Sequence, residues 1–222
     1  MKVLLFGATG MVGQGVLREC LLDADVTAVL SISRSATGRC DDKLREIIVR
    51  DVSDLSSIGH ELTGFDACFF CLGVSSAGMN EPDYRRLTFD LTMSIARMLA
   101  PKNPEMTFIY VSGAGTDSTE RGRMMWARVK GATENALLKL PFKRAMMFRP
   151  AYIQPLHGIT SKTPIYRAAY VVLAWMYPLL KLVASSYVTT TEQIGKAMLA
   201  VAKRGAPKSI LESSDIVAES RM

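Results

Sequence analysis

Short apolar segments alternate with amphipathic segments along most of the chain. Short segments rich in apolar residues, which we predict to be strands, lie at 2–6, 26–33, 46–50, 66–72, 106–112 and 145–149. The segment 66–72 is nearly all apolar, as expected for a central parallel strand covered on both faces. Segments with the apolar spacing of a helix lie between them, at 11–22, 82–100 and 123–140. Short connections between alternating strands and helices favour right-handed crossovers. The pattern therefore predicts an α/β fold with a doubly wound parallel sheet.

The alternation ends after Pro150. Residues 168–180 carry no charge, but they are too few to cross a bilayer, and Pro178 interrupts them. They fit a core helix, a lid over an apolar substrate or a membrane-surface segment, and we expect no stable membrane insertion. An amphipathic helix is predicted at 191–204, after threonines that can cap it. Because no long linker is present, we expect one domain over 1–222, in which 151–222 form a small C-terminal helical elaboration at the substrate or lid side.

A glycine-rich loop follows the first predicted strand directly. The residues from Gly7 to Gly13 read GATGMVG, and the first predicted helix starts at Met11. In this setting Gly7 permits a tight turn, and Gly10 lets the backbone approach a pyrophosphate. Gly13 lets the helix pack closely on the strand, while the helix N-terminus faces the phosphates. The loop predicts a Rossmann-type domain that binds a nicotinamide dinucleotide.

The end of the second predicted strand indicates which dinucleotide is bound. An NAD site places Asp or Glu there, about 20 residues past the loop, to hold the ribose 2′-hydroxyl. This chain has no carboxylate between 29 and 35, and Arg34 occupies the strand end, with Ser33 and Ser35 beside it and Arg39 further on. A guanidinium binds a 2′-phosphate through charge-assisted hydrogen bonds. The sequence therefore favours NADP over NAD.

The overall charge and composition fit this interpretation. The 222 residues carry a formal net charge of +6, and 49% are hydrophobic. Basic residues are scattered in ones and twos without interleaved aromatic residues, so the charge does not indicate nucleic-acid binding. The apolar run at 2–6 is too short for the core of a signal peptide. We therefore expect a cytoplasmic protein.

The cysteines do not form a metal or redox motif. Cys68 and Cys71 have the CxxC spacing, but they lie within an apolar run that we predict to be a strand. Residues three apart in a strand point to opposite faces, so these two thiols cannot easily share a metal or a disulfide. His60 and His157 add no ligand cluster, and no metal site is predicted.

These motifs together resemble those of the short-chain dehydrogenase/reductase superfamily, in its extended or atypical branch, over about 1–153. GATGMVG looks like the cofactor loop of that branch. Asp51-Val52 resembles the pair that flanks the adenine, 71–73 the loop beneath the cofactor, and 149–153 the segment at the nicotinamide. The nearest likeness is to NmrA-like and NAD-dependent epimerase/dehydratase-like proteins. The cofactor-binding residues implied are Gly7, Thr9, Gly10, Met11, Val12, Gly13, Arg34, Asp51, Val52, Leu72, Gly73, Lys130, Pro150 and Ile153.

The resemblance departs from the family at one catalytic position. Family members use a Ser after the fifth strand and a Tyr-x-x-x-Lys on the next helix, where the ammonium lowers the pKa of the phenol. Ser112 and Lys130 match this pattern, but Trp126 stands in place of the Tyr. Indole cannot serve as a proton shuttle. Tyr84 or Tyr152 is therefore the candidate for a substitute acid.

Three functions follow from this departure. The first is an NADP-dependent oxidoreductase that acts on a small carbonyl or apolar substrate. The second is a catalytically silent NADP-binding redox sensor or interaction protein, in which Trp126 covers the nicotinamide. A nucleoside-diphosphate-sugar epimerase or dehydratase is weaker, since such enzymes are longer and need the missing Tyr. By analogy to the superfamily, helices at 83–100 and 123–140 could form a homodimer face.

Overall fold

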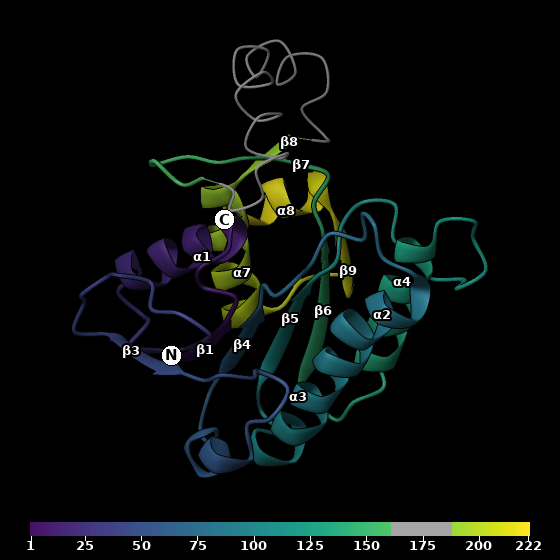
Figure 1. The fold of residues 1–222 in the computed structure, drawn as a ribbon. Helices are drawn as coiled ribbons and strands as arrows, with labels where there is room; N and C mark the ends of the chain where they lie inside the picture. Colours follow the sequence, from purple (N-terminus) through teal and green to yellow (C-terminus); the bar gives the residue numbers. More distant parts are fainter. Residues whose placement is uncertain (161–187) are drawn as a thin grey trace.

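A seven-stranded parallel sheet forms the centre of the molecule in a computed structural model that describes residues 1–160 and 188–222 (Figure 1). Its strands are β1 (Lys2–Phe6), β2 (Ala28–Ser33), β3 (Leu44–Ile48), β4 (Ala67–Phe70), β5 (Thr107–Val111), β6 (Arg144–Arg149) and β9 (Ile210–Glu212). They lie in the spatial order β3-β2-β1-β4-β5-β6-β9. The direction of strand addition reverses between β1 and β4. In open α/β sheets, ligands bind outside the carboxyl ends of the strands at such a reversal.

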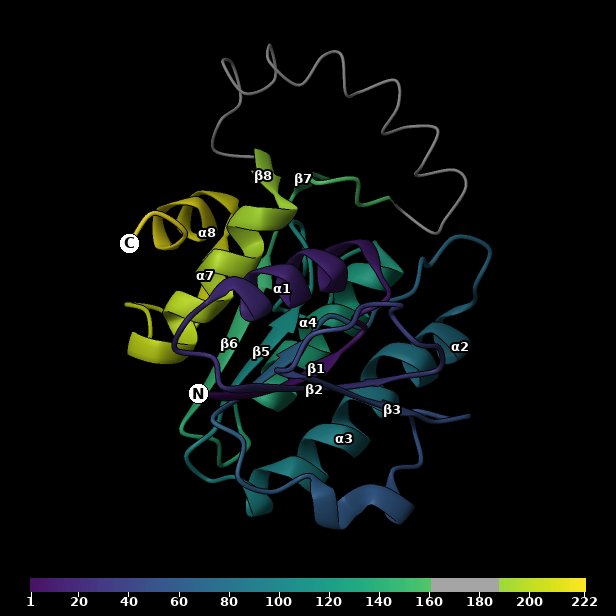
Figure 2. The same cartoon turned by 90° about the vertical axis from the view of Figure 1, so that its left-hand side faces the viewer.

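Helices cover both faces of this sheet, which confirms the predicted doubly wound α/β architecture. The helices are α1 (Met11–Leu22), α2 (Glu81–Arg85), α3 (Leu91–Leu99), α4 (Met125–Leu137), α7 (Thr191–Arg204) and α8 (Ser213–Glu219). The first, α7 and α8 lie on one face, and α2, α3 and α4 lie on the other (Figures 1 and 2). Each face has its own hydrophobic cluster, with Val16 and Ile194 in one and Ile95 and Leu137 in the other. None of the helices among the described residues is long and apolar enough to span a bilayer.

All six strands predicted from apolar runs are present, and their bounds differ by a few residues at most. The seventh, β9, was not predicted because its three residues are too few to show a strand pattern. It pairs with β6 from Met147 to Arg149. A further pair of short strands, β7 (Tyr152–Gln154) and β8 (Val188–Thr190), forms a separate two-stranded sheet. The C-terminal part therefore extends the central sheet as well as adding helices to it.

The helix predicted at 82–100 is interrupted. A π-helical turn, η2 (Arg86–Asp90), separates α2 from α3, and short 3₁₀ turns occur at η1 (Ser56–Glu61) and η3 (Ala100–Lys102). A π turn inserts an extra residue per turn and is common at functional sites.

The predicted helix at 191–204 is confirmed as α7. Its first turn is a capping box in which Gln193 N–H donates to Thr190 Oγ1 at 3.0 Å and Thr190 N–H donates back to Gln193 Oε1 at 3.0 Å. The same helix packs closely on α1, since a Cβ added to Gly15 would lie 2.7 Å from the Thr191 side chain. Residues 168–180, for which three interpretations were open, lie outside the described residues.

The two cysteines of the CxxC spacing point to opposite sides of the sheet, as predicted. Cys68 is buried in the cluster below α3, and Cys71 packs against the cluster below α1. Both are free thiols. Burial raises the pKa of Cys71 to about 12, so this thiol stays protonated at neutral pH.

Candidate functional site

The glycine loop between β1 and α1 is held in one conformation by backbone contacts. Gly7 has φ of +83°, and a Cβ there would lie 2.7 Å from the Cys71 carbonyl group. A Cβ on Gly13 would lie 2.0 Å from Gly7 O, so α1 can approach the loop this closely because position 13 has no side chain. Gly10 N–H donates to Gly7 O at 2.9 Å and closes the turn. The missing side chain at Gly13 thus lets α1 pack directly against the loop.

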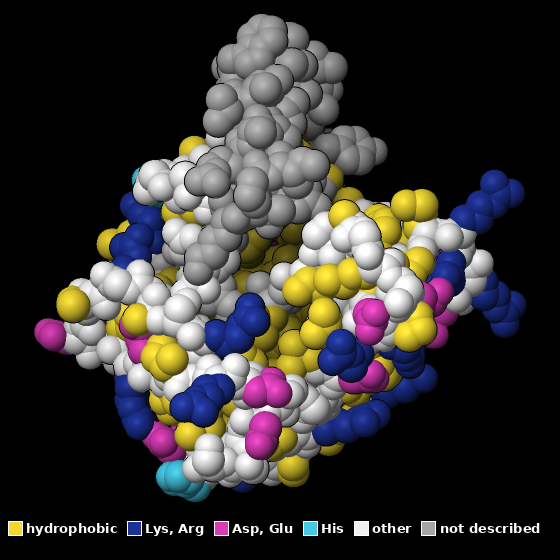
Figure 3. Space-filling view, viewed as in Figure 1, with side chains coloured by type: hydrophobic (Ala, Val, Ile, Leu, Met, Phe, Trp, Pro, Cys, Tyr) yellow, Lys and Arg dark blue, Asp and Glu magenta, His cyan; other side chains and the backbone are white. Residues whose placement is uncertain are grey.

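A cavity of about 600 Å³ opens at the carboxyl ends of the strands, in front of this loop. Twelve of the residues predicted to bind a cofactor or to act in catalysis line it: Gly7, Thr9, Gly10, Met11, Val12, Arg34, Leu72, Gly73, Ser112, Lys130, Pro150 and Ile153. The sequence did not single out Val74, Ser75, Val111 and Gly113, which also line it, and Cys71 was named there within the loop 71–73. Figure 3 shows this face hollowed between α1 and the layer of α2 and α4, with hydrophobic side chains inside and charged ones at the rim.

A second cavity, of about 470 Å³, adjoins the first. Arg34, Leu72, Gly73 and Val74 line both. Asp51 and Val52, the pair predicted at the adenine, line the second one. Its other wall consists of residues from η2 and α3, namely Arg86, Leu87, Asp90, Leu91 and Ser94. Sequence reasoning missed this wall. Arg86, Asp90 and Ser94 are polar residues four apart, a spacing that places them on one face of a helix.

The shape and chemistry of the joined cavities fit an extended dinucleotide. The N-terminus of α1 presents backbone N–H groups that lack helical partners, and these suit a pyrophosphate. An exposed guanidinium, Arg34, stands where the two cavities meet. The far cavity offers Val52, Leu72 and Leu91 as apolar walls for a flat ring. Gly7 and Gly13 let the loop and α1 pack this closely, because a Cβ at either position would meet backbone atoms.

Ser112 lies at the other end of the first cavity and is bound to a buried carboxylate. Its hydroxyl donates to Glu134 Oε1 and also lies 3.1 Å from Phe148 O. Glu134, on α4, is fully buried. Arg149 on β6 holds that carboxylate with Nε at 3.0 Å from Oε1 and 3.2 Å from Oε2. Sequence reasoning did not identify Glu134 or the Glu134–Arg149 pair.

Lys130 reaches the cavity one turn before Glu134 on the same helix. Its Nζ donates to the backbone carbonyl of Ser112 and lies 3.9 Å from the position that a Cβ on Gly113 would take. Burial lowers the pKa of Lys130 to about 8, and the nearby Glu134 carboxylate partly opposes this shift. The ammonium and the neutral amine are therefore both populated near neutral pH.

The aromatic candidates for a proton donor lie outside the residues that line the first cavity. Trp126 stands on the first turn of α4, with its ring 3.4 Å from the position of a Cβ on Gly115. Tyr84 is 1% exposed within α2. Tyr152, on β7, donates its hydroxyl to Gln154 Oε1 at 2.8 Å. None of the three belongs to the described lining.

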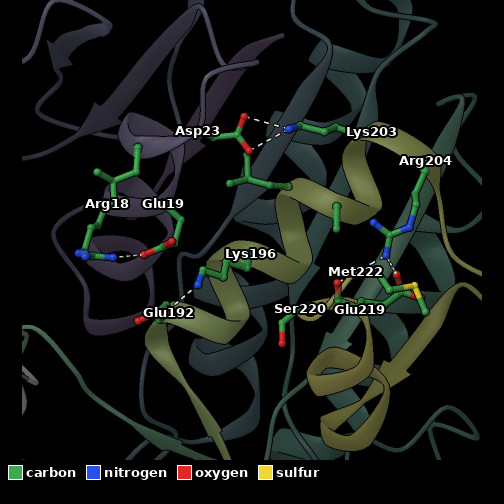
Figure 4. Close-up of a pocket in the computed structure, with 13 residues that line it drawn as sticks. Arg18, Glu19, Asp23, Glu192, Lys196, Lys203, Arg204, Glu219, Ser220 and Met222 are labelled. Atoms are coloured by element: carbon green, nitrogen blue, oxygen red, sulfur yellow. Dashed lines mark hydrogen bonds and ion pairs between the residues drawn. The ribbon is translucent and has the colours of Figure 1, made fainter.

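Another cavity, of about 560 Å³, lies among α1, α7 and α8 and is lined mainly by charged side chains (Figure 4). Each basic group there is paired with an acid. Lys196 contacts Glu192 at 2.6 Å, and Lys203 contacts Asp23 at 2.8 Å. The remaining pairs are Arg18 with Glu19 and Arg204 with Glu219. Since these charges neutralise one another, this cavity has no feature that selects a charged ligand.

No protein-family model matches the chain. It is 30% identical over 159 residues to a protein of Emericella nidulans named "Protein fmp52, mitochondrial", covering 68% of this chain and 66% of that protein. It is 29% identical over 152 residues to "Protein FMP52, mitochondrial" of Saccharomyces cerevisiae, covering 68% and 64%. The matched part thus spans slightly less than two thirds of these relatives. Both relatives are named as mitochondrial proteins, so the prediction of a cytoplasmic location is wrong.

Solved structures resemble the chain over almost its whole length. A short-chain dehydrogenase/reductase of Saccharomyces cerevisiae matches with a TM-score of 0.68 and 14% identity, covering 96% of both chains. The Bordetella bronchiseptica enzyme WbmF in complex with NAD⁺ matches with a TM-score of 0.68 and 14% identity, covering 99% of this chain and 77% of that one. A UDP-N-acetylglucosamine 4-epimerase of Methanobrevibacter ruminantium gives 0.70 and 13%, covering 95% and 75%. At these identities the likeness shows the fold: the chain has the Rossmann-like α/β fold of these proteins.

Proposed function

We propose that this chain is an NADP-binding oxidoreductase that acts on a small carbonyl or apolar substrate. One observation carries the proposal: two joined cavities run along the carboxyl ends of the strands, from Val52 past Arg34 and the N-terminus of α1 to Ser112 and Lys130. Along this path, apolar, cationic and polar walls follow one another in an order that suits a dinucleotide. The solved structure of WbmF, whose fold resembles that of this chain, is a complex of that enzyme with NAD⁺.

The residues at each part of this path suggest how the cofactor would be held. We expect the adenine between Val52 and Leu72, and the pyrophosphate at the N–H groups of Met11 and Val12. The nicotinamide end would then lie toward Pro150, whose segment lines the first cavity. A bound nicotinamide supplies or accepts a hydride, and the chain binds and orients the groups around it.

Arg34 favours NADP over NAD. Its side chain is exposed and lines both cavities, and no carboxylate stands at the end of β2 to hold a free 2′-hydroxyl. Ser33 is turned inward, because its hydroxyl donates to Ser35 O at 2.7 Å, and this leaves Arg34 as the candidate anchor of the 2′-phosphate. Arg39 does not line either cavity within the described residues.

Calorimetric titration of the purified chain with NADPH and NADH tests this proposal. We expect NADPH to bind at least about tenfold more tightly, and Arg34→Ala to remove most of the difference, at about 1.4 kcal/mol for each factor of ten. Arg39→Ala is the matched control, which should bind both cofactors as the wild type does. Equal affinity for NADH and NADPH in the wild type contradicts the choice of NADP, and absence of binding to both contradicts the proposal as a whole.

A silent NADP-binding sensor is the second candidate, and Trp126 favours it, since the usual Tyr is missing at this position. Consumption of NADPH with a panel of aldehydes, ketones and quinones distinguishes the two, because a sensor binds NADPH without consuming it. The names of the relatives also lead us to propose a mitochondrial location for this chain.

A further inference from the structure

An oxidoreductase that reduces a carbonyl needs a proton donor near the substrate oxygen. Trp126, Tyr84 and Tyr152 do not belong to the described lining of the first cavity. Tyr110, on β5, is 1% exposed, and burial raises its pKa further above the usual range of a phenol. The described lining of the first cavity therefore contains no aromatic group that could supply this proton.

Ser112 does not supply it either. Its hydroxyl has one proton, and Glu134 Oε1 accepts it. The Glu134 carboxylate is fully buried and neutralised by Arg149, so this arrangement is fixed by two elements, α4 and β6. A hydroxyl that donates to a buried carboxylate has no second proton for a substrate carbonyl. Ser112 thus has a structural role in holding the wall of the cavity.

Lys130 has both the position and the spare donors. It lines the cavity beside Ser112, Gly113 and Pro150. An ammonium group carries three N–H donors, and the contact with the Ser112 carbonyl uses one. The other two can reach a ribose hydroxyl and a substrate oxygen. The bond to the Ser112 carbonyl also fixes the position of the Lys130 ammonium at the cavity wall.

We propose that Lys130 is the proton donor and acceptor for the substrate oxygen, in the role that a tyrosine has in other members of the superfamily. This inference rests on the proposed function. In the reductive direction, the substrate carbonyl carbon gains a hydride from the reduced nicotinamide dinucleotide, and the carbonyl oxygen gains a proton from the Lys130 ammonium. The products are an alcohol, the oxidised dinucleotide and a neutral amine, which solvent reprotonates.

The charges around Lys130 are compatible with this exchange. Glu134 faces it from the next turn of α4, and Arg149 of β6 balances that carboxylate. The other titratable groups of the described lining are Arg34 and Cys71, and the Cys71 thiol stays protonated. Burial lowers the pKa of Lys130 to about 8. A general acid or base works best when its pKa is near the working pH, and this value is close to neutral pH. Of the groups that line the described cavity, Lys130 is thus the one that changes charge near neutral pH.

The first experiment measures the proton of Lys130 directly, without cofactor or substrate. The full chain is labelled with ¹³C at lysine Cε, and the Lys130 signal is identified by its absence in Lys130→Arg. We expect this signal to titrate with a midpoint of about 8. A midpoint above about 10, the usual range of lysine, overturns the proposal.

The second experiment compares NADPH binding with NADPH oxidation, using an aromatic 1,2-quinone and an aromatic aldehyde as probe substrates. Lys130→Arg keeps a cation but cannot titrate near neutral pH. We expect it to bind NADPH within about tenfold of the wild type and to lose roughly 10²–10⁴-fold in kcat. The exposed Lys139, just beyond the end of α4, provides the matched control: Lys139→Arg should have the wild-type rate. The wild-type rate of reduction should also fall about tenfold per pH unit above the Lys130 midpoint.

The outcomes separate the two proposals. If Lys130→Arg keeps its rate within about threefold, Lys130 is not the proton donor, while the oxidoreductase function stands. If the wild type binds NADPH but reduces neither probe, the inference is overturned and the chain is a silent binding protein. If the wild type does not bind NADPH, the proposed function itself fails, and the inference fails with it.

Discussion

Glu134 and Arg149 form a buried ion pair that joins α4 to β6 directly behind Ser112. Glu134 is fully buried, and the side chain of Arg149 is 11% exposed. Arg149 also donates to Ser118 Oγ at 2.6 Å, so the guanidinium ties the loop after β5 to the same centre. The Glu134 carboxylate also accepts a hydrogen bond from the Ser112 hydroxyl. The wall of the candidate site at Ser112 therefore depends on an ion pair whose carboxylate is fully buried.

Removal of the negative charge from this pair should destabilise the protein strongly. Glu134→Gln leaves the Arg149 guanidinium buried without its counter-ion, and breaking a buried pair in this way costs about 3–5 kcal/mol. We expect a loss near the lower end of that range, since Glu212 lies 3.4 Å from Arg149 and retains part of the compensation. Urea denaturation followed by circular dichroism measures the free energy of unfolding.

The exposed pair of Lys143 and Glu105, 2.9 Å apart, is the control for this prediction. Glu105 is 82% exposed, and an ion pair at the surface contributes about 0–1 kcal/mol. Glu105→Gln should therefore leave the free energy of unfolding almost unchanged. A loss from Glu134→Gln as small as that from Glu105→Gln would contradict the structural role assigned to the buried pair.

The close packing of α1 on the glycine loop gives a second prediction. In Gly13→Ala, the new methyl group would lie 2.0 Å from Gly7 O, so either the loop or the helix must move. Overpacking of this kind costs about 1–3 kcal/mol, and the displaced loop should weaken NADPH binding at least about tenfold. Thermal unfolding and calorimetric titration measure the two effects.

Gly59, in η1, serves as the matched control, because a Cβ there meets no atom within 4 Å. Gly59→Ala should change neither the melting temperature nor NADPH affinity appreciably. Normal NADPH binding by Gly13→Ala would show that the loop can relax without loss of the site, and that the close approach at position 13 is not required.

The sequence was sufficient for the parts of the fold and site that depend on local pattern. Apolar runs identified β1, β2, β4, β5 and β6, and the glycine loop identified the start of the cavity. The short strand β9 escaped detection, because its three residues gain their stability from pairing with β6. Strand formation there depends on a neighbour far along the chain, which no local window contains.

The same reason explains why Glu134 was missed. Helical spacing places it on the face of Lys130, one turn further along α4, and that signal was available. An acid in an amphipathic helix usually faces water, however, and the burial of Glu134 follows from Arg149 arriving on β6. A charged pair made by two distant segments is invisible until the segments are placed.

Lys130 should make the stability of the ligand-free protein depend on pH. Burial lowers its pKa in the folded state to about 8, below the value of 10.5 for an exposed lysine. Between these values the unfolded chain binds more protons, so the free energy of unfolding should rise with pH from about 8 to about 10.5. Below pH 8 both states hold the proton, and the folded state has the full cost of a buried ammonium.

Lys130→Met removes this cost. We expect the variant to be more stable than the wild type at pH 7, by about 1–2 kcal/mol, with a smaller difference at pH 10. Urea denaturation at the two pH values measures it, and Lys139→Met provides the control for a lysine at the surface. A difference between Lys130→Met and the wild type that does not change with pH would show that the lysine has the same proton affinity in both states.

Trp126 should matter for packing more than for chemistry. Its ring faces Gly115, 3.4 Å from the position that a Cβ there would take, and it does not belong to the described lining of the cavity. Trp126→Tyr should therefore cost about 1–2 kcal/mol of stability through lost contacts. Its NADPH affinity and its rate with the quinone probe should stay within about threefold of the wild type, since Lys130 already supplies the proton. A rise of tenfold or more in rate would show that a phenol at position 126 reaches the substrate, and that the site lacks an efficient acid without it.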